Sequence, residues 1–134
     1  LTAGVRAVFN RLKALGDDLH RDLDVTSAMR AVMESLAADG AMTVPQIARL
    51  KGVTRQHVQL LADTLIAAGL AAIKENPAHR RSSLIALTDK GRRTFAKMRG
   101  REVPIVTELA DEFDAQELDR AATVLARLAA ITHG

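Results

Sequence analysis

Two short segments on either side of Gly52 constrain the fold more than any other feature of the sequence. Residues 43–46 read Thr-Val-Pro-Gln, so a capping hydroxyl is followed by a proline in the first turn and by a glutamine three residues later. This pattern predicts the start of a helix. Thr54 is expected to be the N-cap of a second helix. Gly52 lies between the two segments, and glycine readily adopts the positive φ that a tight turn requires.

A helix-turn-helix also needs a small residue in its first helix and an apolar stripe on its second helix, which packs back against the first. Ala48 supplies the small residue, four positions before the glycine. The apolar stripe of the second segment is Val58, Leu61 and Leu65. The sequence therefore predicts a helix-turn-helix. The alternative is a pair of unrelated core helices joined by a glycine turn.

The spacing of the apolar residues changes after Gly69. Residues 70–74 and 83–87 have the short apolar pattern of strands, and the loop between them contains Arg80 and Arg81. The sequence therefore predicts a small β-hairpin with a basic tip.

Helices are predicted on both sides of this region by the spacing of the apolar residues. One covers residues 2–20, and another begins after Thr26, which is a suitable N-cap. A long helix follows the hairpin, and a last helix is capped by Asp114. Pro104 lies inside the long helix and its ring meets the carbonyl group four residues earlier, so we expect a kink near Gly100.

The charge of the chain is segregated. Residues 43–99 hold eleven Lys or Arg against three Asp or Glu, which gives this segment a net charge of +8. The two flanks together have a net charge of −5, and the whole chain has a net charge of +3. A basic middle region is typical of a surface that binds a polyanion, although solvated helix faces would also account for it.

Composition excludes several classes of function. The aromatic residues are three phenylalanines, with no Trp and no Tyr, which disfavours a protein that stacks unpaired bases. The chain has no cysteine, so a disulfide, a thiolate metal site and a cysteine nucleophile are excluded. The four histidines lack the spacing of a metal site, and no nucleophile elbow or glycine-rich phosphate loop is present. We therefore expect no enzyme activity, no metal and no cofactor.

The sequence also indicates where the protein is found. The longest uncharged run, residues 64–73, is too short to cross a bilayer, and no secretory signal is visible. We therefore expect a cytoplasmic protein without a membrane partner. Because the sequence begins with Leu1 instead of Met, we also expect that it has been trimmed or renumbered.

The second helix of the predicted motif would present its N-terminal residues to a partner. Arg pairs with guanine and Gln with adenine through two hydrogen bonds each, and a helix N-terminus favours phosphate through its free backbone donors. Arginines on a hairpin tip can enter a minor groove or bind phosphates. A solvated polar face and a hydrated loop are the alternatives. The candidate DNA-binding residues are Thr54, Arg55, Gln56, His57, Gln59, Arg80 and Arg81.

Five segments between residues 43 and 91 form a pattern: they are residues 43–48, 52–58 and 65–70, Asn76-Pro77 with Arg80-Arg81, and residues 87–91. Together they resemble the MarR family of bacterial transcriptional regulators, and the resemblance covers the whole chain because the flanking helices also match in place and length. The most specific of them is Leu-Thr-Asp-Lys-Gly at residues 87–91, which follows the basic hairpin.

The resemblance implies a mainly α fold with a small β-hairpin wing, a winged helix-turn-helix flanked by N- and C-terminal dimerisation helices. It implies one MarR-like domain over residues 1–134, with the DNA-binding lobe at 26–99 and dimerisation helices at 1–25 and 100–134. It also implies a homodimer on a roughly palindromic double-stranded DNA operator and, in many members, a small aromatic or anionic effector that releases the DNA. The apolar stripes of the terminal helices separately favour a dimer, although antiparallel packing within one chain is the alternative.

Two positions depart from the family pattern. His79 stands two residues before Arg81, where the family usually has an Asp that steadies the arginine. Leu60 stands where the recognition helix often has Arg. Both changes remove features that favour DNA binding, so two other functions stay open. One is a winged-helix protein-interaction module that uses Leu60, and the other is a ligand sensor with weak or no DNA binding.

Overall fold

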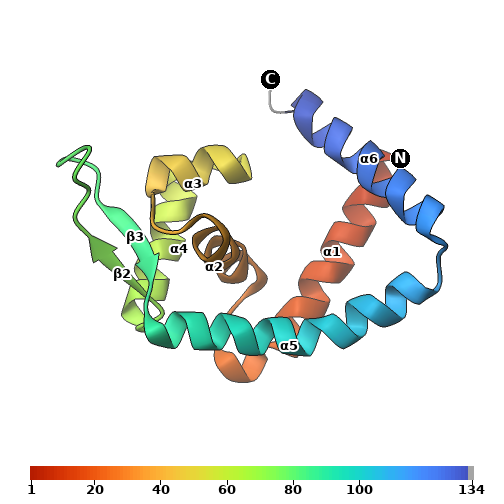
Figure 1. Ribbon diagram of the computed structural model, residues 1–134, viewed down its shortest axis with the longest axis horizontal. Coiled ribbons are helices and arrows are strands. Elements are labelled where there is room, and N and C mark those ends of the chain that lie inside the picture. The colour runs from red at the N-terminus through yellow and green to blue at the C-terminus, as the bar shows by residue number, and fades with distance from the viewer. Residues whose placement is uncertain (133–134) are drawn as a thin grey trace. The chain divides into compact units, whose positions relative to one another are not determined.

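The structure is a computed structural model, and it describes residues 1–132 (Figure 1). It is mainly helical with a small antiparallel sheet, as the sequence predicts. The elements are α1 (Thr2–Leu19), a 3₁₀ turn η1 (Arg21–Leu23), α2 (Ser27–Asp39), β1 (Met42–Thr43), α3 (Val44–Lys51), α4 (Arg55–Ala67), β2 (Ala71–Lys74), β3 (Leu84–Leu87), α5 (Asp89–Asp111) and α6 (Ala115–Thr132).

The sheet has three strands in the order β1-β3-β2, all antiparallel. In the hairpin, Ala71 pairs with Leu87 and Lys74 pairs with Leu84. The third strand, β1, was not expected from the sequence. It contains only Met42 and Thr43, and two residues are too few to show the alternation that identifies a strand.

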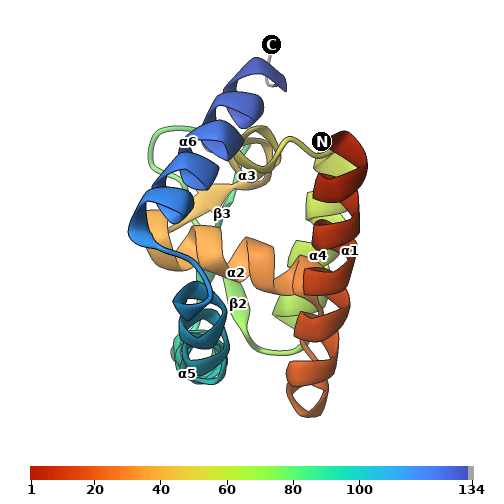
Figure 2. The same ribbon diagram turned by 90° about the vertical axis from the view of Figure 1, so that its right-hand side faces the viewer.

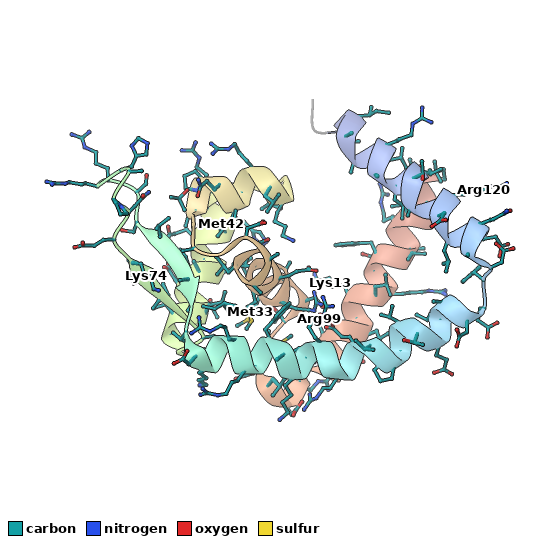
Figure 3. The ribbon with its side chains drawn as sticks, viewed as in Figure 1. Lys13, Met33, Met42, Lys74, Arg99 and Arg120 are labelled. Atoms are coloured by element: carbon teal, nitrogen blue, oxygen red, sulfur yellow. The ribbon has the colours of Figure 1, made fainter. Side chains whose placement is uncertain are left out.

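The chain falls into two compact units, residues 1–98 and 99–134. In the first unit, one core gathers apolar side chains from α2, α3, α4, the hairpin strands and the start of α5. The core lies around Met33 of α2, which is fully buried (Figure 3). Its largest fully buried side chains are Met33, Ile47, Val58, Leu65 and Met98.

The junction between α1 and α2 is held by hydrogen bonds at the start of α2, where the two helices lie crosswise (Figure 2). The backbone N–H of Ser27 donates to a carboxylate oxygen of Asp17 at 2.7 Å, and its hydroxyl donates to the carbonyl of Lys13 at 2.8 Å. Thr26 caps α2 by accepting from the backbone of Met29, as the sequence predicts. The hydrogen bonds from Ser27, with a smaller effect of Lys13, hold the pKa of Asp17 below its usual value of 3.8.

The second unit contains the end of α5 and the whole of α6. Asp114 caps α6 as predicted, because its carboxylate accepts from the backbone of Glu117 while Glu117 accepts from the backbone of Asp114. Pro104 lies inside α5, which is one continuous helix from Asp89 to Asp111. The kink near Gly100 stays a prediction.

Candidate nucleic-acid interface

Two capped helices and a left-handed turn position the N-terminus of α4. Thr43 and Gln46 form both hydrogen bonds of a capping box at the start of α3. Gly52 ends α3 with φ 66°, the left-handed conformation that the sequence predicts for this glycine. The next residue donates its backbone N–H to the carbonyl of Ala48 at 3.1 Å, and Thr54 then caps α4 through the backbone of His57. The predicted helix-turn-helix is therefore confirmed.

The two faces of α4 have different environments. Val58, Ala62 and Leu65 are fully buried against the core, and Leu61 is partly buried. The first residues of the other face are polar and exposed. They are the predicted candidates Arg55, Gln56, His57 and Gln59, preceded by the exposed cap Thr54.

The motif at residues 87–91 ties the end of α4 to the start of α5. The Thr88 hydroxyl donates to the carbonyl of Gly69 at 2.6 Å and accepts from the backbone of Gly91. The Lys90 ammonium donates to the carbonyl of Ala68 at 2.9 Å, so a positive charge lies at the C-terminal end of α4, where the helix dipole favours it.

Gly91 is required by the close approach of the backbone. A Cβ atom at this position would lie 1.9 Å from the carbonyl oxygen of Leu70, the residue before β2. Since no side chain fits there, the Lys-Gly pair places α4, the hairpin and α5 at fixed positions relative to one another.

The wing is the β2–β3 hairpin with the loop of residues 75–83, and Lys74 lies exposed where β2 ends (Figure 3). Asn76 organises the loop, because its carbonyl accepts from the backbone of His79 and its side chain accepts from the backbone of Ala78. His79 in turn accepts from the backbone of Ser82. The position at which the family usually has Asp therefore shapes the loop through its main chain. The predicted residues Arg80 and Arg81 are both exposed in this loop.

A groove of about 490 Å³ lies between the start of α4 and the wing. Arg55, Gln56 and Gln59 line it from α4, and Arg81 lines it from the wing. The structure thus brings together four of the seven residues predicted for the site. The remaining three, Thr54, His57 and Arg80, do not line the groove.

Sequence reasoning missed the other residues of this groove. Ser82 and Ser83 add hydroxyl groups beside Arg81, and the rest of the lining is apolar. The two serines directly follow the arginine pair in a loop, and that position could have marked them. No sequence signal marked the apolar residues, which come from the start of α3 and from β2 and β3. They are Val44, Pro45, Ile73 and Ile85.

Residues 1–132 hold neither a helix that could span a membrane nor a cluster of metal ligands. None of the helices in this range is long and apolar enough to cross a membrane. Within the same residues, no group of three or more His, Asp or Glu side chains is arranged to hold a metal ion.

The fold and the surface around α4 define a winged helix-turn-helix protein. No family model matches the chain. An uncharacterized protein of Mycobacterium tuberculosis is 43% identical over 94 residues, which are 70% of this chain and 66% of that protein. The match thus spans just under two thirds of the relative. The HTH-type transcriptional repressor MdtR of Bacillus subtilis is 28% identical over 125 residues, 93% of this chain and 81% of that protein.

Solved structures share the whole fold. The YusO protein of Bacillus subtilis matches with a TM-score of 0.67 and 27% identity, over 96% of this chain and 91% of that one. A mutant MarR of E. coli complexed with operator DNA matches with a TM-score of 0.86 and 20% identity, over 96% and 92% of the two chains. BpsR of Bordetella bronchiseptica matches with a TM-score of 0.83 and 22% identity, over 96% of this chain and 92% of that one. Its structure concerns the regulation of its DNA binding by 6-hydroxynicotinic acid.

The chain has the winged helix fold of the MarR-family transcription regulators, and the resemblance found in its sequence is confirmed. Among these relatives, MdtR is named as an HTH-type transcriptional repressor.

Proposed function

We propose that this protein is a sequence-specific regulator of transcription that binds double-stranded DNA as a homodimer. The observation that carries the proposal is the groove in which the exposed side chains at the start of α4 face an arginine of the wing. Both elements belong to the basic segment of the chain, so they present hydrogen-bonding side chains and positive charge to the same ligand. A duplex needs both, because phosphates supply most of the affinity and base edges supply specificity.

The candidate residues have two proposed roles: some contact bases in the major groove, and others hold the wing against the flanking DNA. The first two turns of α4 enter the major groove. The side chains that contact base edges or position the helix there are Arg55, Gln56, His57 and Gln59. Thr54 caps α4, and the free backbone N–H groups at the N-terminus of this helix face a phosphate. Arg80 and Arg81 anchor the wing on the flanking minor groove or its phosphates.

The exposed apolar side chains of the terminal helices support the homodimer. Fourteen of the eighteen large apolar residues that are exposed in the described chain lie on α1, at its start, or between residues 103 and 131. Apolar stripes of this size mark protein–protein contacts. In the dimer, each recognition helix would read one half-site of a roughly palindromic operator, and the half-sites would lie about 10 bp apart.

The relatives support a proposal for an effector and for the direction of regulation. The solved neighbour BpsR has its DNA binding regulated by 6-hydroxynicotinic acid, which is a small aromatic acid. We propose a small aromatic or anionic effector for this chain also. Because the named relative MdtR is a repressor, the proposed regulator represses its targets in the cytoplasm until the effector releases the DNA.

The proposal is tested by measuring DNA binding at several salt concentrations on a site selected in vitro from random duplexes. The binding constant is expected to fall steeply as salt rises, because phosphate contacts release counterions. Arg81→Ala should weaken binding to all sequences and reduce the slope against log salt by about one per protomer. Gln59→Ala should instead relax the preference at particular bases.

Arg120→Ala is the matched control, since Arg120 is an exposed arginine on α6 outside the basic segment (Figure 3). It should leave the salt slope unchanged. Binding that does not respond to salt, or equal losses on every sequence for both Arg81→Ala and Gln59→Ala, would contradict the proposed division of roles.

A further inference from the structure

Leu60 is an apolar side chain in the middle of a polar surface. It lies on α4 and is 66% exposed, more than any other large apolar residue between α2 and the start of α5. It stands four residues after Gln56 and directly after Gln59, so it shares the outward face of the recognition helix with these amides. The buried stripe of α4 lies on the opposite side and does not include it.

The position of Leu60 differs from that of the residues in the groove. Arg55, Gln56 and Gln59 line the groove beside the wing, whereas Leu60 does not. Leu60 therefore continues the proposed DNA-reading surface beyond the groove. Because leucine neither donates nor accepts a hydrogen bond, only an apolar group on the DNA would match this side chain.

The neighbouring amide is held in a defined orientation. The Nε2 atom of Gln59 donates to a carboxylate oxygen of Asp63 at 2.9 Å, along one turn of the exposed helix face. One N–H and the carbonyl oxygen of Gln59 stay available. These are the donor and the acceptor that match N7 and the N6 amino group of adenine.

We propose that Leu60 reads thymine, by packing against its C5-methyl group beside an adenine that Gln59 recognises. This inference rests on the proposed function and gives it a base preference. The thymine methyl is the apolar group that an unmodified base pair exposes in the major groove. A leucine beside two amides therefore selects A·T pairs at this point of each half-site.

Replacement of thymine by deoxyuridine tests the proposal, because the replacement removes the methyl group and keeps every hydrogen-bonding group. The wild-type protein first selects its operator from random duplexes. Each thymine of the half-site is then replaced in turn, symmetrically in both half-sites. One position is expected to lower the affinity of the wild-type protein about ten- to twenty-fivefold, from a loss of about three- to fivefold in each half-site.

Three variants connect the effect to Leu60. Leu60→Ala should bind the thymine and deoxyuridine duplexes equally, and its circular dichroism should be unchanged because the side chain is exposed. Leu50→Ala truncates a half-exposed leucine of α3 and should keep the wild-type ratio of the two affinities. Arg81→Ala should weaken binding to both duplexes and keep the ratio.

The possible results separate this inference from the function on which it rests. If the wild-type chain selects an operator but no thymine is sensitive to replacement, thymine reading is wrong and the proposed function stands. The same holds if Leu60→Ala keeps the discrimination, and Leu60 would then be free to contact a protein partner. If the wild-type chain selects no duplex at all, the proposed function and the inference are both wrong.

Discussion

The winged region and the terminal helices treat their apolar side chains in opposite ways. From α2 to the start of α5, large apolar residues are buried in one core, and only Leu50, Val53, Leu60 and Ile73 are largely exposed. By contrast, α1 and α6 contain no buried residue although both are strongly amphipathic. The winged region is therefore stabilised by its own residues, whereas the terminal helices present apolar stripes that need another surface.

The largest effect is expected from Gly91→Ala, a substitution inside the winged region. The new Cβ atom would meet the carbonyl of Leu70 at 1.9 Å, so the backbone must move. We expect a loss of about 3 kcal/mol in the free energy of unfolding, measured by urea denaturation. Gly100→Ala is the control, because a Cβ there meets nothing within 4 Å; it should stabilise α5 by about 0.5–1 kcal/mol. Equal stability of the two variants would refute the close approach.

The terminal helices are tested by Phe9→Asp on α1, where the phenylalanine is 65% exposed. A charge in an apolar interface is expected to raise the dimer dissociation constant at least about thirtyfold, measured by sedimentation. Leu50→Asp places the same charge on a half-exposed leucine of α3 and should leave the dimer intact. If Phe9→Asp sediments like the wild type, α1 does not contribute to a dimer.

A smaller effect is expected at the start of the recognition helix. The Thr54 hydroxyl accepts from the backbone of His57 at 3.1 Å, so Thr54→Ala leaves that donor without its cap. The free energy of unfolding should fall by about 1 kcal/mol in urea. Thr54→Ser keeps the hydroxyl and should restore most of the loss. An alanine variant as stable as the serine variant would show that the cap is unimportant.

The smallest effect is expected at the junction of α1 and α2 and depends on pH. Because the pKa of Asp17 is lowered in the folded chain, its carboxylate contributes stability above the usual value of 3.8. That contribution is lost as pH falls through the folded pKa. Asp17→Asn should therefore be less stable than the wild type at pH 7, by under about 1 kcal/mol because solvent screens the group. Thermal unfolding from pH 7 to pH 2 should show the difference vanish, and a constant difference would contradict the assignment.

The sequence predicted the local elements that depend on capping and periodicity. The caps at Thr26, Thr43, Thr54 and Asp114 are each confirmed by hydrogen bonds to the predicted helix starts. These features depend on residues three positions apart, so the sequence displays them directly. The positive φ of Gly52 is of the same kind.

Features that depend on distant residues were harder to predict. Strand β1 forms because Met42 and Thr43 meet β3 more than forty residues later, and two residues carry no periodic signal. The groove combines α4 with the wing, so its apolar lining could not be listed from either segment. The motif at residues 87–91 was recognised, but its reason, the contact of Gly91 with the Leu70 carbonyl, is visible only in the structure.

In the proposed complex, two copies of this chain place their recognition helices on one duplex. Native mass spectrometry of the protein with its selected operator measures the number of chains bound to each duplex. Two chains are expected on an inverted repeat whose half-sites lie about 10 bp apart. A single bound chain, or a selected sequence without an inverted repeat, would contradict it.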